Sequence, residues 1–423
     1  MAKSRAIWLL FGCQTLLSGG LSLSFPFFAL YLHRDRGVSM AIVGACLSIS
    51  FLTTAFGQGL GGELSDIAGR RRTMLAGVLG RTVLVAALGG AMLLDWPVWI
   101  LFLFHFGSSM LGNLYDPAAR SWIADRTNES ERVRAYGLLR IAENVGWAVG
   151  PALGGFLAEA SYPLLFLATA GVCALGTLAL YLGIDESHGA LRSEGFRFAG
   201  ILGAADDRRF LRFCLFMVLL GVVMSQLVVS LSMFAVEYVR ISEGQVGLLF
   251  SLNGLLVVAL QYPISAWWER FRLTTSLAVG AVLYAAGWLA VGFSSGFAHL
   301  SLAMVVVTLG EMTVSPAIMA LPANMAPAKL KGRYQGFAGM TRQLGMSFGP
   351  LSGGFGLQHL SALWAPAHWV GVAALGLAAA GGFLRLRSFL TIREEGYAET
   401  PPDSPARTMP FEANVKVEGV EGA

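Results

Sequence analysis

Twelve long apolar runs, each long enough to cross a lipid bilayer, dominate the sequence. A membrane-spanning helix needs about 20 mostly apolar residues, and the runs lie at about 7–32, 39–61, 73–94, 97–119, 136–158, 162–183, 210–235, 244–267, 274–294, 298–320, 334–357 and 362–385. Backbone polar groups within lipid must be satisfied inside the segment, so such runs form helices. Hydrophobic residues make up 55% of the chain and charged residues 13%, too little charge for a water-covered surface. The sequence therefore predicts an all-α membrane protein with twelve transmembrane helices.

A repeat divides the twelve runs into two sets of six. The glycine-rich segment in the fifth run recurs 199 residues later in the eleventh: Gly146, Gly150, Pro151, Gly154 and Gly155 are matched by Gly345, Gly349, Pro350, Gly353 and Gly354. One offset held over about 38 residues indicates a duplicated unit. We expect two pseudo-symmetric six-helix bundles at 1–183 and 210–388, a polar linker at 184–209 and a disordered tail rich in Glu and Pro at 389–423. Such repeats are typical of transporters with a substrate site between the halves.

Basic residues distinguish the two membrane faces. They gather at the termini and in the even-numbered loops, for example at Arg70–Arg72, whereas the opposite side carries only Arg34, Arg36 and Arg240. Cytoplasmic loops are enriched in Lys and Arg. We therefore expect both termini to be cytoplasmic, in a bacterial cytoplasmic (inner) membrane, and we expect no nucleic-acid partner.

Motifs of enzymes and metal sites are missing from the sequence. Cys13, Cys46, Cys173 and Cys214 lie in apolar runs without CxxC spacing, which favours isolated thiols over a disulfide or a metal site. No HExxH, GxSxG or P-loop pattern occurs in a supporting context. We expect no enzymatic activity, no cofactor and no metal, and an ion gradient as the energy source.

Three segments resemble a known family. The loop GELSDIAGRR at 62–71 resembles the signature of the major facilitator superfamily, with Gly62, Asp66, Gly69, Arg70 and Arg71 at its positions. GWAVGPALGG at 146–155 resembles the signature of the drug:proton antiporter branch, and the tenth run followed by KGRYQG is similar to bacterial multidrug efflux proteins. The resemblance extends to about residue 388. Two positions depart from it: Ile67 replaces a basic residue, and the fourth run carries His105, Ser108 and Ser109 but no mid-helix arginine.

The resemblance implies a monomer, embedded in membrane lipids, that exports small amphipathic molecules, cationic or neutral, in exchange for protons by alternating access. It implies that the 62–71 loop is a cytoplasmic gate in which Asp66 meets the start of the eleventh run near Arg333. It also implies that Pro151 and its neighbouring glycines form a bend that seals the antiporter against leak. Close helix packing is the simpler explanation of those glycines.

Glu311, an acid in the middle of the tenth run, is the strongest candidate for coupling. It lies about 13 residues into a run of about 23, where an ionised carboxylate costs several kcal/mol. The group avoids this cost by binding a proton or pairing with a cation, and an antiporter requires both abilities. The alternative is a helix-packing glutamate kept neutral by a hydrogen bond.

Three charged groups in the first half are further candidates for coupling or substrate contact. Arg140 and Glu143 lie one turn apart in the fifth run and form either an internal ion pair or part of the gating surface. Asp116 precedes a proline at the inner end of the fourth run, where it caps a broken helix or contacts substrate. His105 fits a helix–helix hydrogen bond better than a proton carrier.

Two other functions stay open. The same fold serves uniporters or symporters that import a metabolite, and lipid transporters. A non-transporting membrane receptor is the alternative from a different class, and a substantial soluble domain would favour it.

Overall fold

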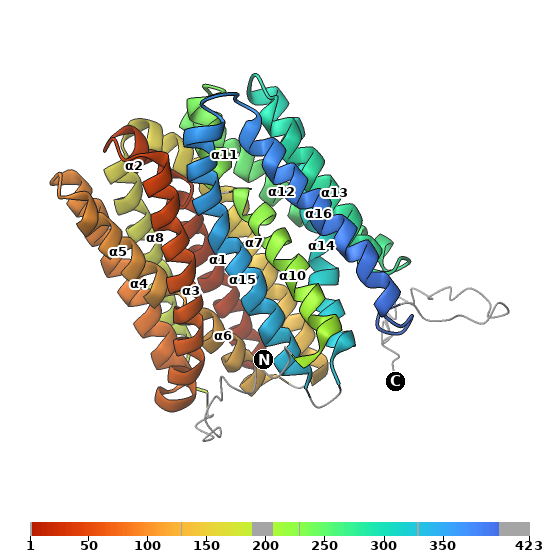
Figure 1. Ribbon diagram of the computed structural model, residues 1–423. Helices are drawn as coiled ribbons and strands as arrows, with labels where there is room; N and C mark the ends of the chain where they lie inside the picture. Colours follow the sequence, from red (N-terminus) through yellow and green to blue (C-terminus); the bar gives the residue numbers. More distant parts are fainter. Residues whose placement is uncertain (1, 128, 188–205, 228, 328–329, 397–423) are drawn as a thin grey trace, which may run out of the picture.

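The protein is a bundle of long helices that run side by side, as the computed structural model shows (Figure 1). The structure describes residues 2–127, 129–187, 206–227, 229–327 and 330–396. The first residues of α1 and the last residues of α16 lie at the same end of the bundle, which we call the terminal end (Figure 1). The opposite end is called the far end.

The N-terminal half crosses the bundle six times. Its helices are α1 (Ala2–Ser24), α2 (Phe27–Arg34), α3 (Met40–Ala68), α4 (Arg70–Leu93), α5 (Val98–Gly112), α6 (Tyr115–Arg126), α7 (Glu129–Ala160) and α8 (Tyr162–Gly183). The first crossing breaks at Pro26, between α1 and α2, since proline cannot donate the helical hydrogen bond. The fourth breaks just before Tyr115, so that Asp116 lies in the first turn of α6.

The C-terminal half repeats this arrangement. Its helices are α10 (Arg208–Met224), η2 (Ser225–Leu227), α11 (Val229–Glu237), α12 (Glu243–Trp268), α13 (Leu273–Gly292), α14 (Phe297–Met325), α15 (Lys331–Phe355), η3 (Gly356–Leu360), α16 (Ala367–Leu386) and η4 (Arg387–Phe389). The first crossing of this half is also broken, between α10 and α11. The predicted fold, twelve helices in two six-helix bundles, is confirmed.

Ten helical segments of the described chain are long and apolar enough to span a membrane. The other two crossings are α7 and α15, with 32 and 25 residues. At 1.5 Å per residue both exceed the hydrocarbon thickness of about 30 Å. They are more polar because they lie between the two halves, where α7 packs on α12 and α15 packs on α3.

The glycine repeat lies on the faces of α7 and α15 that meet their own half. Gly146, Gly150 and Gly154 pack against α1, and their counterparts Gly345, Gly349 and Gly353 pack against α10, η2 and α11. A Cβ on Gly146 would meet the α1 backbone at Gly19, so the helix contact requires glycine there. These positions show the close packing that small residues allow between membrane helices.

The opposite faces of α7 and α15 meet the other half. Pro151 and Gly155 lie against α12, and their counterparts Pro350 and Gly354 lie against α3. A Cβ on Gly155 would lie 2.8 Å from the Gly244 Cα, and a Cβ on Gly354 would lie 3.0 Å from the Gly44 Cα. The duplicated segment thus makes equivalent contacts between the halves twice.

The C-terminal tail begins later than the sequence indicates. Residues 390–396, placed in the expected tail, pack against α13. The buried Glu395 carboxylate accepts hydrogen bonds from the Thr274 N–H (3.0 Å) and the Thr274 hydroxyl (2.7 Å). It satisfies a backbone donor that the first turn of α13 leaves free, which explains why this short segment is held. Most of the expected linker, 188–205, and the tail from 397 on lie outside the described residues.

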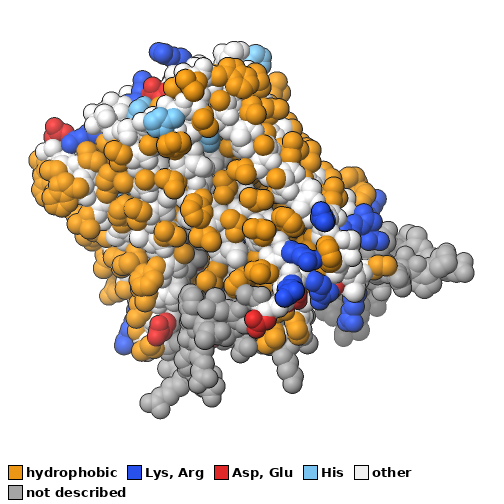
Figure 2. All heavy atoms as spheres, in the orientation of Figure 1, with side chains coloured by type: hydrophobic (Ala, Val, Ile, Leu, Met, Phe, Trp, Pro, Cys, Tyr) orange, Lys and Arg blue, Asp and Glu red, His pale blue; other side chains and the backbone are white. Residues whose placement is uncertain are grey.

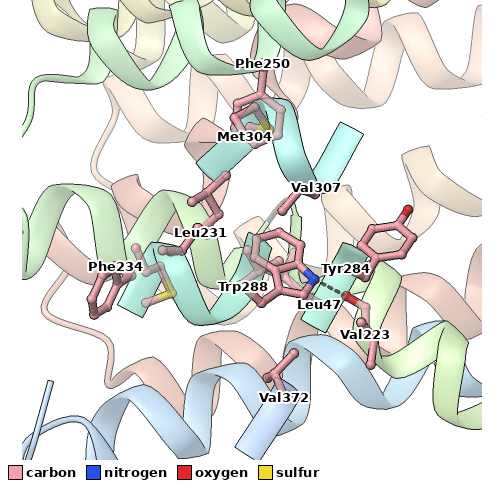
Figure 3. Close-up of a cluster of buried hydrophobic side chains, with 14 of the residues drawn as sticks. Leu47, Val223, Leu231, Phe234, Phe250, Tyr284, Trp288, Met304, Val307 and Val372 are labelled. Atoms are coloured by element: carbon pink, nitrogen blue, oxygen red, sulfur yellow. Dashed lines mark hydrogen bonds between the residues drawn. The ribbon is translucent and has the colours of Figure 1, made fainter. Parts of the chain in front are cut away.

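Lipid-facing and buried surfaces differ as a membrane protein requires. Figure 2 shows hydrophobic side chains across the middle of one face and charged side chains mostly near its two ends. Inside the C-terminal half, Trp288 is fully buried and donates its indole N–H to the Val223 carbonyl at 3.0 Å (Figure 3). The cores of the helix bundle are thus packed by large apolar groups, with the polar handle of the indole satisfied.

Candidate functional site

The Glu311 carboxylate lies inside the bundle rather than toward lipid. Its Oε2 accepts a hydrogen bond from the Asn253 side-chain amide of α12 at 3.0 Å, and the same amide donates to the Thr308 hydroxyl at 2.9 Å. Glu311 is half-buried on α14, near the middle of that helix. The acid therefore faces a polar partner on a neighbouring helix of its own half.

A charge from the other half acts on Glu311. Arg140 of α7 interacts electrostatically with Glu311 and with Arg342 of α15. The Arg140 side chain is solvent-accessible, and it forms no ion pair within 4 Å in the described part of the chain. Arg342, the repeat counterpart of Glu143, also interacts with Tyr284. One acid and two arginines, drawn from both halves, thus interact electrostatically within the bundle.

Asp116, Arg140 and Glu143 lie around one pocket of the N-terminal half. This pocket, of about 350 Å³, is also lined by Gln14 and Arg120. Glu143 interacts electrostatically with Asp116, Arg140 and Arg120. The ion pairs of the described residues do not include one between Arg140 and Glu143. The pocket brings together three of the four residues that the sequence proposes for coupling, and Arg140 connects it to Glu311.

A second cavity, of about 220 Å³, lies in the middle of the bundle and is lined mainly by the N-terminal half. Its polar lining residues include Arg81, His105, Ser108, Ser109, Asn113 and Thr169, and its aromatic lining residues include Phe25, Phe28, Trp147 and Phe166. Val229 and Gln343 of the C-terminal half complete it. We call it the central cavity.

Two residues of the central cavity differ from expectation. The His105 ring stacks on Phe28 with centroids 4.3 Å apart, and its side chain forms no hydrogen bond with any residue that the structure describes, so the expected helix–helix hydrogen bond is not found there. Sequence reasoning does not predict Arg81 of α4 as a site residue, because the resemblance points to an arginine in the fourth run. The charge of Arg81 within the third apolar run is the sequence signal that marks it.

The two halves are joined by charge at the far end. Arg34 of α2 pairs with Glu237 at 3.3 Å and with Glu243 at 2.5 Å, both from the C-terminal half. The Tyr162 hydroxyl donates to Glu243 at 3.2 Å. Glu243 is therefore shared between an arginine and a tyrosine of the opposite half.

Backbone hydrogen bonds extend this closure along the two interfacial helix pairs. The Gly244 N–H donates to Glu159 at 2.9 Å, the Ala152 N–H to the Ser251 hydroxyl at 3.1 Å, and the Ala41 N–H to Gln358 at 2.9 Å. Over the described residues, the hydrogen bond from the Gln343 side chain to the Phe51 carbonyl (3.4 Å) joins the halves at mid-bundle, and the other hydrogen bonds and ion pairs found between the halves lie nearer the far end. The structure is closed at that end.

Arg70 and Arg71 of the loop signature bind within the N-terminal half. Arg70 donates to the Ser65 hydroxyl at 2.9 Å and pairs with Asp125 of α6 at 3.3 Å. Arg71 donates to the carbonyls of Tyr181 (2.7 Å) and Ile184 (2.5 Å) at the end of α8. These two arginines hold the turn between α3 and α4 against α6 and α8.

The remaining signature positions are structurally distinct. Gly69 has φ +102°, a conformation that favours glycine, and it lets α3 turn directly into α4. Gly62 lies in α3 with open space around its Cα. The side chains of Asp66 and Arg333, the expected gate contact, lie outside the described residues.

The four cysteines are free thiols. Cys13, Cys173 and Cys214 are buried, as the sequence suggests, and Cys46 is half-buried. Among the described residues, no group of three or more His, Cys, Asp or Glu side chains could hold a metal ion.

Two repeated six-helix halves, joined at one end by ion pairs between them, define a membrane transporter rather than an enzyme. Comparison of the sequence with protein families gives the same class: residues 10–238 and 211–416 each match the Major Facilitator Superfamily. The chain belongs to the Major Facilitator Superfamily.

Relatives and solved structures support this assignment. The chain is 28% identical over 363 residues to "Multidrug resistance protein MdtH" of Photorhabdus laumondii, covering 84% of this chain and 87% of that protein. It is 26% identical over 352 residues to "Uncharacterized MFS-type transporter YttB" of Bacillus subtilis, covering 80% and 85%. In fold it is similar to a POT family transporter in complex with a thioalcohol-conjugated peptide (TM-score 0.77, 14% identity, covering 92% of this chain and 97% of that one).

Proposed function

We propose that the protein is a proton-coupled antiporter that exports small amphipathic molecules by alternating access. The relatives named as multidrug resistance proteins support export. The basic residues of the even-numbered loops support a bacterial cytoplasmic membrane with both termini inside. In that orientation the terminal end is cytoplasmic, and the closed far end is the one away from the cytoplasm.

The observation that carries the proposal is the Glu311 carboxylate inside the bundle, where it accepts a hydrogen bond from Asn253 and interacts electrostatically with Arg140 of the opposite half. When Glu311 is ionised, Arg140 of the opposite half attracts it; when Glu311 binds a proton, that attraction is lost and the repulsion between Arg140 and Arg342 remains. Proton binding therefore changes the relative free energies of arrangements that differ in the distance between the halves. A ligand shifts a conformational equilibrium only by such a difference.

The pocket around Asp116 and Glu143 provides a second proton-binding element. Two neighbouring carboxylates repel each other, and a proton on either one relieves the repulsion. Arg140 borders this pocket and also interacts with Glu311. We propose that it couples the charge state of the pocket to that of Glu311.

The 62–71 loop is proposed as the cytoplasmic gate. Arg70 and Arg71 fix the turn between α3 and α4, so Asp66 is carried on a rigid support at the end of α3. An aspartate near the start of α15 would be stabilised by the helix dipole, by about 0.3–1 kcal/mol, when the terminal end closes. Pro151 and Gly155 pack against α12, and their counterparts Pro350 and Gly354 pack against α3. These two contacts form the seal between the halves at the far end.

The direct test replaces Glu311 by Gln, which keeps the shape and removes the ionisation. In proteoliposomes with an imposed pH gradient, purified Glu311→Gln should lose proton-driven efflux of an amphipathic fluorescent dye, whereas Glu269→Gln, at an exposed position at the end of α12, should transport the dye normally. Efflux by Glu311→Gln at the wild-type rate would refute the assignment. Dye uptake in place of efflux under the same gradient would establish the importer alternative.

A further inference from the structure

Arg81 places a positive charge in the wall of the central cavity. The side chain comes from α4 and is half-buried. It fits where Gly112 leaves room, because a Cβ at that position would overlap the guanidinium. The residues that line the cavity include Arg81 and His105 and no Asp or Glu.

The guanidinium keeps its donors free. Across the described residues Arg81 forms no hydrogen bond and no ion pair within 4 Å. Its electrostatic interactions are with Cys173 and Asp116, and Asp116 faces the neighbouring pocket, where Glu143 and two other arginines surround it. A planar group with five N–H donors is therefore available to the cavity.

Thr169 supplies a second donor without a partner. Its side chain lines the same cavity and is 1% exposed, and its hydroxyl makes no hydrogen bond. Buried polar groups are almost always paired, so this unpaired hydroxyl in the wall of the cavity is free to donate a hydrogen bond to a ligand. Neighbouring Asn113 is already occupied, donating to the Ser109 carbonyl at 2.7 Å.

The rest of the cavity is aromatic. Phe28 and Phe166 meet edge to face, with centroids 5.9 Å apart and planes at 69°, and Phe25 and Trp147 do so at 5.5 Å and 86°. Such ring edges and faces favour a flat aromatic ligand. A cavity of about 220 Å³ suits one or two fused rings and excludes a phospholipid with two acyl chains.

We infer that the central cavity binds an aromatic amphiphile through an anionic group, a carboxylate or its equivalent, held by Arg81 and Thr169 with the rings of the ligand between the aromatic side chains. This inference rests on the proposed function in taking the cavity as the substrate site. It replaces the cationic or neutral substrate expected from the sequence by an anionic or zwitterionic one.

The test compares three probes that share one ring system: 2-naphthoate, 2-naphthamide and 2-naphthylmethylammonium. Binding to purified protein in phosphatidylcholine nanodiscs, without any gradient, is measured by calorimetry. A hydrogen-bonded charge pair in a protected site predicts that naphthoate binds wild-type protein at least about tenfold more tightly than the other two. Equal or tighter binding of the amide or the ammonium probe would overturn the inference.

Variants assign the preference to its residues. Arg81→Gln should abolish the preference for naphthoate, Arg81→Lys should retain part of it, and Arg270→Gln, at an exposed position outside the cavity, should leave it unchanged. Thr169→Val should weaken the binding of naphthoate more than the binding of naphthamide. If Arg81→Gln fails to fold, the Thr169→Val measurement serves as the test in its place. A preference that persists in folded Arg81→Gln, or in Thr169→Val without any loss, would refute the inference.

Two further arms separate the inference from its neighbours. If an anionic lipid headgroup were the ligand, phosphatidylglycerol nanodiscs would suppress naphthoate binding to wild-type protein but not to Arg81→Gln, and this result would overturn the small-molecule assignment. Charge-selective binding together with absent proton-driven efflux would refute the proposed antiport alone. Normal efflux with no charge selectivity would refute this inference alone.

Discussion

Removing the Arg34 side chain should open the far end of the transporter. Arg34 pairs with Glu237 and Glu243 across the interface of the two halves, so these pairs exist only while the far end is closed. We therefore expect Arg34→Gln to shift the conformational equilibrium toward the state that is open at that end.

The size of this shift follows from the exposure of the partners. The Arg34 side chain is 46% exposed, whereas Glu243 is 13% exposed. Exposed ion pairs contribute about 0.2–1 kcal/mol each. Two screened pairs, one to a mostly buried carboxylate, give about 1 kcal/mol, which corresponds to about a fivefold change in the equilibrium constant.

Spin labels at Leu94 and Leu363, both exposed at the far end, report the distance between the halves by pulsed electron resonance. The ratio of the long-distance to the short-distance population should rise about fivefold in Arg34→Gln. High salt should move the wild-type protein in the same direction, because it screens exposed charges.

Arg240→Gln, which removes an exposed arginine at the same end with no ion pair among the described residues, is the matched control. An unchanged distance distribution in Arg34→Gln, or an equal change in Arg240→Gln, would refute the reasoning.

Two other predictions concern the glycine contacts between the halves and the capping of α13 by Glu395. Gly155→Val and Gly354→Val should each reduce the closed population at the far end, because an added side chain meets backbone of the other half. Gly371→Val, where a Cβ meets nothing within 4 Å, should not, and the same spin-label pair measures this; equal effects at all three positions would exclude the steric explanation. Glu395→Gln should destabilise the protein by about 1 kcal/mol through weaker capping at Thr274, seen as a lower midpoint of thermal unfolding in detergent. An unchanged midpoint would show that residues 390–396 do not stabilise the fold.

Several site residues can be predicted from the sequence because the feature that marks them lies in the residues next to them in the chain. Glu311 stands out as a charge within an apolar run, and such a group is expensive in lipid wherever its neighbours lie. The glycine repeat shows an internal duplication without any structure. The start of the tail was misjudged because Glu395 is held by a helix that lies more than a hundred residues earlier in the chain.

Hydropathy, length and repetition are properties of consecutive residues, so they are enough to predict the set of helices, their division into two halves and an acid in the middle of a transmembrane run. Which charges meet depends on the tertiary structure. Arg81 enters the central cavity because α4 packs with its guanidinium beside Gly112 of α5, and Arg140 acts on Glu311 because α7 lies against the opposite half. Such neighbours depend on how helices distant in sequence rotate and pack against one another, and hydropathy does not encode that rotation.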